Sequence, residues 1–220
     1  MRCGLAGVVK GESAAAGRRV RDAAGSREKL LRAATEEFAA HGIAGARVDR
    51  IGAIAGVNKA LIYAYFGSKD QLFDAVMDSH VTRVLDEVPF TPDDLPRYAG
   101  LLFDFLLANP HQLRLATWHR LERAGTGREP AELSASLRRN ADAIGAAQAE
   151  RQVPGDFAAE DLLVFTLALA SAWMPASPTA MPAERTQQTR AHRGAVVEAV
   201  RRLTEGAPGL GDAGGAGTVG

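Results

Sequence analysis

Between residues 58 and 69 the sequence groups side chains that suit the binding of phosphate. Asn58 can cap a helix that begins after it, and the N-terminus of a capped helix offers backbone amides and a positive dipole to an anion. Lys59 follows in the first turn, and Tyr63 lies one turn later on the same face. Tyr65 lies about 200° from Tyr63 around the helix, so we expect the two to bind different phosphates or only one of them to bind. Lys69 stands near the start of the next helix, where its charge and the helix terminus can act together.

The distribution of charge favours a nucleic-acid partner for this region. Taken singly, each of these residues also fits a three-helix bundle with solvated lysines and half-buried tyrosines. The chain of 220 residues has a formal net charge of zero. However, residues 1–70 hold 12 Lys and Arg against 7 Asp and Glu, whereas residues 71–220 hold 14 against 19. A basic front end is what a polyanionic partner requires.

A sharp corner between two short helices positions these side chains. We expect a helix over 48–55, a turn at Gly56 and a second helix from Asn58, because glycine accepts the left-handed backbone that a tight corner needs. Ala55 is small enough for the two helices to approach closely. The apolar residues expected to face inward are Val48, Ile51, Ile54, Val57, Ile62 and Phe66. The corner is therefore expected to be a helix-turn-helix.

The stretch "IGAIAGVNKALIYAYFGSKDQLF" resembles the DNA-binding signature of TetR-type transcriptional regulators, I-A-x-x-A-G-V-S-x-G-x-L-Y-x-H/Y-F-x-S-K-x-x-L. The strong match covers residues 26–73. The resemblance implies a homodimer with a helix-turn-helix at each N-terminus and a larger helical domain that dimerises and binds a small molecule. It also implies a repressor that the ligand releases from a palindromic operator. Carried over by position, Lys59 and Ala60 contact bases, while Tyr63, Tyr65 and Lys69 hold phosphates.

Four positions depart from the pattern of this family. Arg47 replaces a small hydroxyl residue that caps the first helix of the corner, and arginine can bind phosphate but cannot cap in that way. Gly52 replaces alanine and is expected to weaken its helix by ~1 kcal/mol. Asn58 replaces serine and keeps the cap. Ala60 replaces glycine, and its methyl group could meet the methyl group of a thymine.

The whole chain is expected to be all-α, with about nine helices in an N-terminal helix-turn-helix domain and a larger helical domain. Residues 1–25 are expected to be a disordered basic tail, residues 26–73 the DNA-binding domain, and residues 206–220 a disordered Gly-rich tail. Ser26 is the expected cap of the first helix. The fourth helix begins with a capping box at Ser68 and continues to about residue 87. The later helices are expected at 93–108, 110–124, 129–152, 158–173 and 184–204, within a domain that spans 88–205.

The second domain shows the pattern of a ligand-binding and dimerisation unit. The helices within 98–123 are apolar on more than one side, as in helices that line a cavity or are fully buried. The candidate pocket residues are Phe103, Phe105, Trp118, His119 and Trp173, although each aromatic residue fits a plain core better than the wall of a ligand pocket. The segment 158–174 is apolar nearly all round, and together with 184–204 it is our candidate for a four-helix dimer interface. An internal core helix is the alternative.

Other classes of protein find less support in the sequence. Motifs for metal, nucleotide or nucleophilic catalysis are absent, so we expect no enzyme, cofactor or metal site. A DNA-binding protein without a ligand remains the alternative. The single cysteine, Cys3, excludes an intrachain disulfide and fits the cytoplasm. The longest apolar run, Leu162 to Met174, is shorter than the roughly 20 residues that a membrane span needs.

Overall fold

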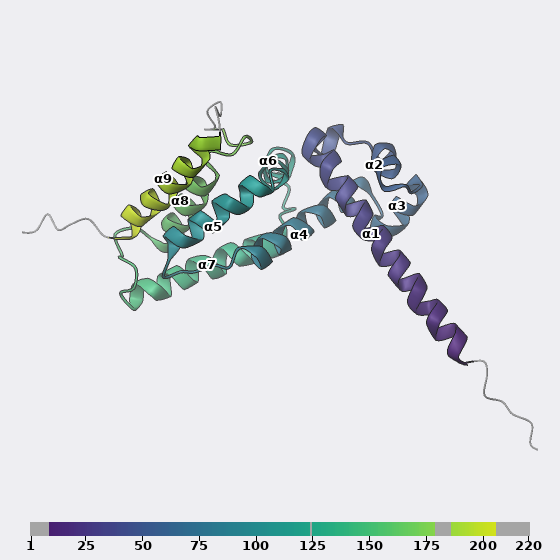
Figure 1. Cartoon of the computed structure of the whole chain (residues 1–220), viewed down its shortest axis with the longest axis horizontal. Helices are drawn as coiled ribbons and strands as arrows, with labels where there is room; N and C mark the ends of the chain where they lie inside the picture. Colours follow the sequence, from purple (N-terminus) through teal and green to yellow (C-terminus); the bar gives the residue numbers. More distant parts are fainter. Residues whose placement is uncertain (1–8, 124, 179–185, 206–220) are drawn as a thin grey trace, which may run out of the picture. The chain divides into compact units, whose positions relative to one another are not determined.

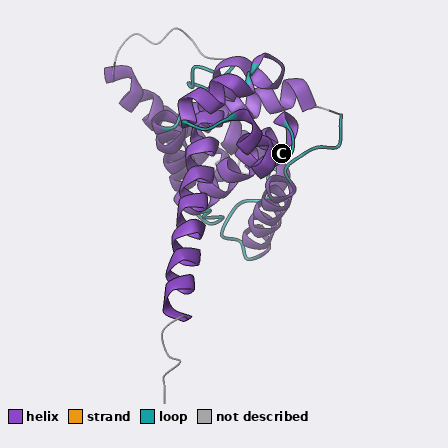
Figure 2. Ribbon diagram, turned by 90° about the vertical axis from the view of Figure 1, so that its right-hand side faces the viewer, coloured by secondary structure: helices purple, strands orange, loops and turns teal. Residues whose placement is uncertain are grey.

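The computed structural model describes residues 9–123, 125–178 and 186–205. Within these ranges the chain forms nine α-helices and no strand, which confirms the predicted all-α class (Figures 1 and 2). The predicted tail at 206–220 and the first eight residues of the predicted basic tail lie outside the described residues. The chain divides into two compact units, Met1–Met77 and Asp78–Gly220, and the division falls inside the fourth helix.

The N-terminal unit contains α1 (Val9–Gly45), α2 (Val48–Ala55), α3 (Lys59–Phe66) and the first part of α4 (Lys69–Glu87). Helix α1 begins well before Ser26, so the predicted cap at Ser26 is wrong and this serine lies inside the helix. Gly42 interrupts α1 near its end, because it leaves helical geometry with a φ of 68° and kinks the helix. The predicted cap at Ser68 is also present, since its hydroxyl accepts a hydrogen bond from the backbone N–H of Gln71 at 3.1 Å.

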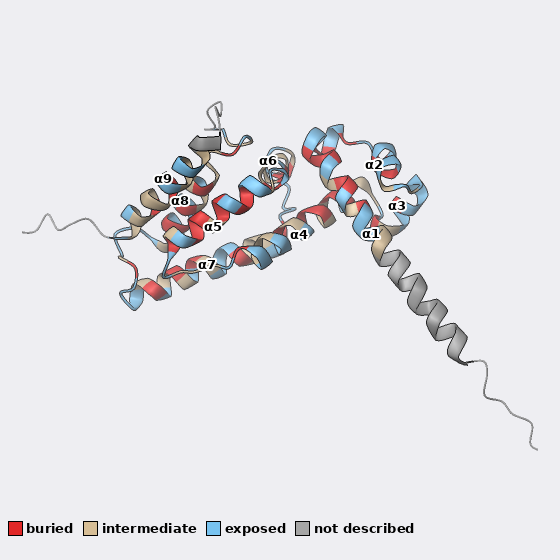
Figure 3. Cartoon of the chain, viewed as in Figure 1, coloured by how far each residue is buried: buried red, intermediate tan, exposed pale blue. Residues whose placement is uncertain are grey.

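Buried residues of all four helices, red in Figure 3, form the interior of this unit. Phe38 of α1 and Phe73 of α4 meet edge to face, with ring centroids 5.1 Å apart. Ile51 of α2 and Ile62 of α3 are each at most 1% exposed. The interior thus ties the two short helices of the corner to the two longer ones.

The predicted inward position of Ile54 is wrong, because its side chain is 57% exposed. The buried residues of α2 are Val48, Ile51 and Gly52. The centre of this buried face, measured around the helix axis, lies close to Val48. At about 100° per residue, Ile54 lies roughly a third of a turn from that centre. Gly52 occupies the buried position instead, and its lack of a side chain explains why the periodicity of large apolar residues misplaced the inward face.

The second unit contains the rest of α4 with α5 (Leu95–Ala108), α6 (His111–Arg123), α7 (Ala131–Ala149), α8 (Ala159–Ser171) and α9 (Thr186–Thr204). These bounds agree with the predicted ranges to within a few residues. Helix α5 packs against α8 and α9, and α7 packs against α8. Asp94 caps α5 by accepting a hydrogen bond from the N–H of Arg97 at 3.0 Å.

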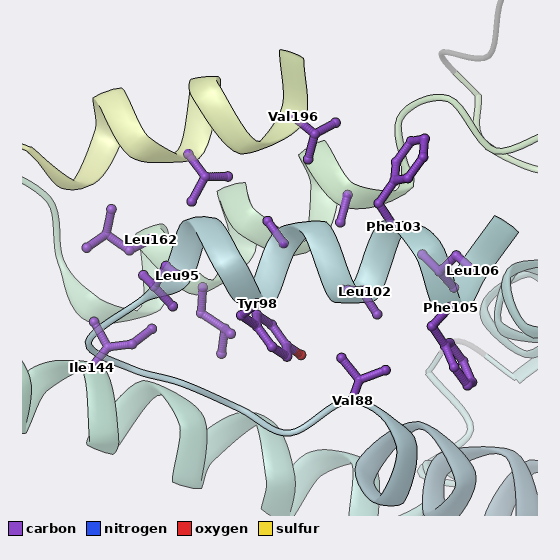
Figure 4. Close-up of a cluster of buried hydrophobic side chains, with 14 of the residues drawn as sticks. Val88, Leu95, Tyr98, Leu102, Phe103, Phe105, Leu106, Ile144, Leu162 and Val196 are labelled. Carbon is purple, nitrogen blue, oxygen red and sulfur yellow. The ribbon is translucent and has the colours of Figure 1, made fainter. Parts of the chain in front are cut away.

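Helix α5 lies at the centre of the core of the second unit (Figure 4). Leu95, Ala99 and Phe103 recur every four residues along it and are at most 1% exposed. Ile144 of α7, Leu162 of α8 and Val196 of α9 belong to the same cluster of buried residues. Apolar packing of α7, α8 and α9 with α5 therefore accounts for the core of this unit. None of the described helices is both long and apolar enough to span a membrane.

Candidate nucleic-acid interface

The corner between α2 and α3 has the geometry that its residues predict. Gly56 adopts the left-handed conformation, with φ 69° and ψ 32°. The backbone N–H of Val57 donates to the carbonyl oxygen of Gly52 at 2.9 Å, which closes the turn. The Asn58 side chain accepts a hydrogen bond from the N–H of Leu61 at 2.8 Å. The predicted cap at Asn58 is confirmed, and it fixes where α3 starts.

Gly52 has a structural reason that the sequence pattern does not reveal. A Cβ atom at this position would lie 2.8 Å from the carbonyl oxygen of Val57 and 3.5 Å from the Cδ1 atom of Ile62. Contacts of a Cβ with a backbone oxygen below 3.0 Å are essentially not found in proteins. The absence of a side chain therefore lets the start of α3 approach α2 closely, in addition to the expected loss of helix propensity.

The outward face of α3 carries three of the predicted DNA-binding residues, because Lys59, Ala60 and Tyr63 are all exposed. The Lys59 ammonium lies 3.1 Å from a carboxylate oxygen of Asp49 on α2. The Tyr63 side chain is 40% exposed, so its hydroxyl is accessible to a partner. An ammonium and a phenol thus stand one turn apart on the same side of the helix.

Two other predicted contacts are placed differently. Tyr65 is half-buried, and its ring lies 6.2 Å from that of Phe66. The Lys69 ammonium donates hydrogen bonds to the carbonyl oxygens of Ala44 and Ala46, each at 3.3 Å. Lys69 therefore bridges the start of α4 to the end of α1 and the following loop. Its contact with phosphate, like that of Tyr65, stays a prediction.

Arg47 precedes α2 without capping it through its side chain, as expected. A buried carboxylate does so instead, because Oε1 of Glu37 accepts a hydrogen bond from the backbone N–H of Arg47 at 2.8 Å. Arg50 donates to the same carboxylate from Nε at 2.9 Å and from Nη2 at 2.6 Å. The Glu37 side chain is only 4% exposed. This one buried carboxylate of α1 therefore holds the N-terminus of α2 in place.

The ionisation of Glu37 follows from these partners. Burial raises the pKa of the Glu37 carboxyl, but the hydrogen bonds from Arg50 and from the backbone of Arg47, with the charges of Arg50 and His41, outweigh it. The net result is a pKa below the ordinary value of 4.5. The sequence analysis missed this residue, although a glutamate directly before Phe38 on the apolar side of a helix was a usable signal.

Arg27 lies on α1, and its guanidinium carbon is 5.4 Å from the centre of the Phe66 ring. A guanidinium over an aromatic face at this distance is a cation–π contact. Arg27 thus packs on the end of α3 and also leaves a positive charge beside it.

Comparison with known proteins identifies the same family in the N-terminal part of the chain and in the C-terminal part. Residues 30–76 match the family "Bacterial regulatory proteins, tetR family", and residues 94–202 match "Tetracyclin repressor-like, C-terminal domain". The chain is 39% identical over 153 residues to the HTH-type transcriptional repressor SCO4008 of Streptomyces coelicolor, which covers 69% of this chain and 79% of that protein. This chain belongs to the TetR family.

The crystal structure of a similar protein supports the same fold for this TetR-family regulator. The crystal structure of SCO4942 from Streptomyces coelicolor, assigned as a transcriptional regulator, is 35% identical with a TM-score of 0.70. The match covers 82% of this chain and 98% of that one. The HTH-type transcriptional repressor NicS of Pseudomonas putida is 39% identical over 62 residues, 28% of this chain and 29% of that protein. The protein is therefore a DNA-binding transcriptional regulator and not an enzyme.

The predicted pocket residues of the regulator occupy several environments. Phe103 and Phe105 are buried in the core cluster, and Trp173 packs against that cluster. The Trp173 ring also stacks on the His192 ring, with their centroids 3.6 Å apart. Trp118 is half-buried. The ring of His119 is buried and lies 3.0 Å from the carbonyl oxygen of Arg128. These contacts explain Phe103, Phe105, His119 and Trp173 as parts of the packing. The contact of all five residues with a ligand stays a prediction.

A polar pair that the sequence analysis did not select lies between α4 and α6. Gln112 is 7% exposed and forms a side-chain hydrogen bond with His80. Burial lowers the pKa of the His80 imidazole, and this effect exceeds the opposite effect of the Gln112 hydrogen bond. The amide nitrogen of Gln112 is buried without a hydrogen-bond partner among the described residues. A buried donor of this kind suits an acceptor oxygen on a small molecule.

Proposed function

We propose that α3 is the recognition helix of this regulator. It inserts into the major groove of DNA, with Lys59 and Ala60 near base edges and Tyr63 on a phosphate. The exposed position of these three residues on one capped helix carries the proposal. Arg47 and the N-terminus of α3 add phosphate contacts, while Lys69 and Tyr65 contribute mainly by holding the unit together. The protein acts in the cytoplasm, where its DNA lies.

The operator we propose is palindromic, because the regulator acts as a homodimer that presents two recognition helices. The proposed interface consists of α8 and α9 of each subunit. Leu162 and Leu163 of α8 are buried in the core, whereas Val164 is 59% and Phe165 38% exposed. A helix with apolar groups on both its buried and its exposed side requires a second partner to cover the exposed side. Val164→Asp should therefore reduce the mass of the particle in solution to that of one chain.

The regulator we propose is a repressor that a small molecule releases from its operator. The effector binds in the second unit, and Gln112 donates a hydrogen bond to an oxygen atom of the effector. Phe103, Phe105, Trp118, His119 and Trp173 are the candidate apolar and polar neighbours. The name of the relative SCO4008 as a repressor, and the buried amide of Gln112, support this proposal.

A protection footprint on the DNA upstream of the regulator's own gene, at two salt concentrations, tests the proposal. We expect a palindromic footprint that weakens as salt rises, because phosphate contacts release counterions. Lys59→Ala and Tyr63→Phe should each weaken binding to this operator without unfolding the protein. Arg138→Ala on α7, which removes an exposed cation of the other unit, is the matched control. If both α3 variants bound like the parent, α3 would not be the recognition helix.

A further inference from the structure

The outward face of α3 is unusually poor in hydrogen-bonding groups for a helix that reads DNA. Its eight residues are KALIYAYF. Ile62 and Phe66 are buried, and the exposed residues are Lys59, Ala60, Leu61, Tyr63 and Ala64. At about 100° per residue, Ala60 and Ala64 lie at the middle of the exposed arc, with Lys59 and Tyr63 toward one edge and Leu61 at the other.

The side chains that make paired hydrogen bonds to base edges are arginine, lysine, asparagine and glutamine, and of these α3 contains only Lys59. The side-chain oxygen of Asn58, which precedes α3, already accepts the N–H of Leu61. The ammonium of Lys59 is paired with Asp49 at 3.1 Å. Direct hydrogen-bond readout by α3 is therefore limited to the two groups at one edge of its outward face.

We infer that Ala60 and Leu61 read thymine bases through the C5-methyl group, and that these methyl contacts determine the sequence specificity of the regulator. The inference rests on the proposed role of α3 as the recognition helix. In the major groove the C5-methyl group is the apolar mark that distinguishes thymine from the other bases. The small side chains of Ala60 and Ala64 allow the helix backbone to come close to the base pairs. Leu61, 36% exposed on α3, then reaches a methyl group at its own edge of the helix.

The placement of Leu61 supports a contact with DNA over an interior role. Its backbone N–H is held by the Asn58 cap, so its backbone is fixed in the first turn of α3. That terminus directs its amides toward phosphate, and a leucine there meets the groove wall or floor when the helix docks. Burial of one methyl group against an apolar side chain changes affinity by about fourfold.

The test replaces the thymines of the operator, one at a time, by deoxyuridine, which removes the C5-methyl group and leaves the hydrogen-bonding edges unchanged. We measure binding of the full-length protein to each duplex by fluorescence anisotropy. In the parent protein, at least one replacement in each half-site should lower affinity by about fourfold. Leu61→Ala should abolish the effect at one thymine, and Ala60→Gly should abolish it at another. Ratios between paired duplexes cancel any change that a variant makes in folding.

A matched leucine of the second unit serves as control. Leu121 on α6 is 70% exposed, and Leu121→Ala should retain every thymine effect of the parent. Equal affinity of the parent for all thymine and deoxyuridine duplexes would overturn the inference. So would thymine effects that persist unchanged in Leu61→Ala and Ala60→Gly.

Failure of the recognition-helix proposal has a separate signature. If Lys59→Ala and Tyr63→Phe leave operator affinity unchanged, α3 does not dock in the groove, and both proposals fall. If these variants weaken binding while deoxyuridine has no effect, only the thymine-methyl inference falls.

Discussion

Different interactions stabilise the interior of each of the two units of this TetR-family regulator. In the second unit, a cluster of buried apolar side chains surrounds α5, and Phe103 at 1% exposure is typical of it. In the N-terminal unit, polar groups add to a smaller apolar interior, because Glu37 holds the start of α2 and Lys69 holds the end of α1. Two eight-residue helices bury little surface, so directional hydrogen bonds are needed to fix their orientation.

The difference shows how each unit suits its role. Hydrogen bonds have defined directions, so they can fix the placement of a short recognition helix to within a fraction of an ångström. Apolar packing has no preferred direction and tolerates substitution of similar volume, so the core of the second unit can accept changes in its side chains that the corner cannot. The next four predictions test this contrast, beginning with the largest expected effect.

Phe103→Ala should lower the free energy of unfolding of the second unit by about 4 kcal/mol, because it removes a fully buried ring from the central helix. Leu107→Ala on the same helix is the control, since Leu107 is 48% exposed and its loss should cost less than about 0.5 kcal/mol. Urea unfolding followed by circular dichroism measures both. Similar losses in the two variants would contradict the placement of Phe103 in the core.

Glu37→Gln should lower the free energy of unfolding by about 2 kcal/mol and weaken operator binding, because Arg50 and the start of α2 lose a buried carboxylate. Glu36→Gln alters the neighbouring exposed glutamate and should have almost no effect on either quantity.

The Glu37→Gln variant should also change how the stability of the fold depends on pH. The pKa of Glu37 is lower in the folded protein than the ordinary value of 4.5, so its ionised form stabilises the fold. This contribution is complete above pH 4.5 and is lost as the pH falls through the folded-state pKa. Urea unfolding at a series of pH values should therefore show a shallower loss of stability in acid for Glu37→Gln than for the parent. If the stability of Glu37→Gln fell as steeply in acid as that of the parent, the ionised carboxylate of Glu37 would not stabilise the fold.

Gly52→Ala and Gly194→Ala should change stability in opposite directions. The new methyl group at position 52 would lie 2.8 Å from the carbonyl oxygen of Val57, so we expect a loss of about 1 kcal/mol despite better helix propensity. Gly194 on α9 is exposed with nothing within 4 Å, so alanine there should add about 1 kcal/mol. Thermal unfolding of both variants decides the sign. A gain at both positions would show that the corner relaxes around the methyl group.

Asp49→Asn should raise operator affinity by about threefold, the smallest of the four effects, because it releases Lys59 from an exposed ion pair and removes a negative charge near DNA. The dependence of affinity on salt should become steeper for the same reason. Asp86→Asn, on the part of α4 that belongs to the second unit, is the control. Unchanged binding by Asp49→Asn would mean that Lys59 leaves Asp49 at no cost when DNA binds.

Local signals in the sequence were sufficient for the helices and the corner. The left-handed Gly56 and the cap at Asn58 each depend on residues within one turn of the chain, and both were predicted. Ser26 was predicted as a helix start on the same kind of signal, yet α1 continues through it. A serine can cap a helix but does not by itself prevent one from beginning earlier.

The sequence by itself therefore determined the all-α class, the order of the helices and the residues at the turn, because hydrogen bonds within a helix link residues only four apart. The partners of Glu37, Lys59 and Lys69 became known only from the folded chain. These partners lie on other helices or in the loops between them, at least ten residues away. The angle and depth at which two helices pack select such pairs. Those quantities depend on the volumes of all the side chains between them, including the missing side chain at Gly52.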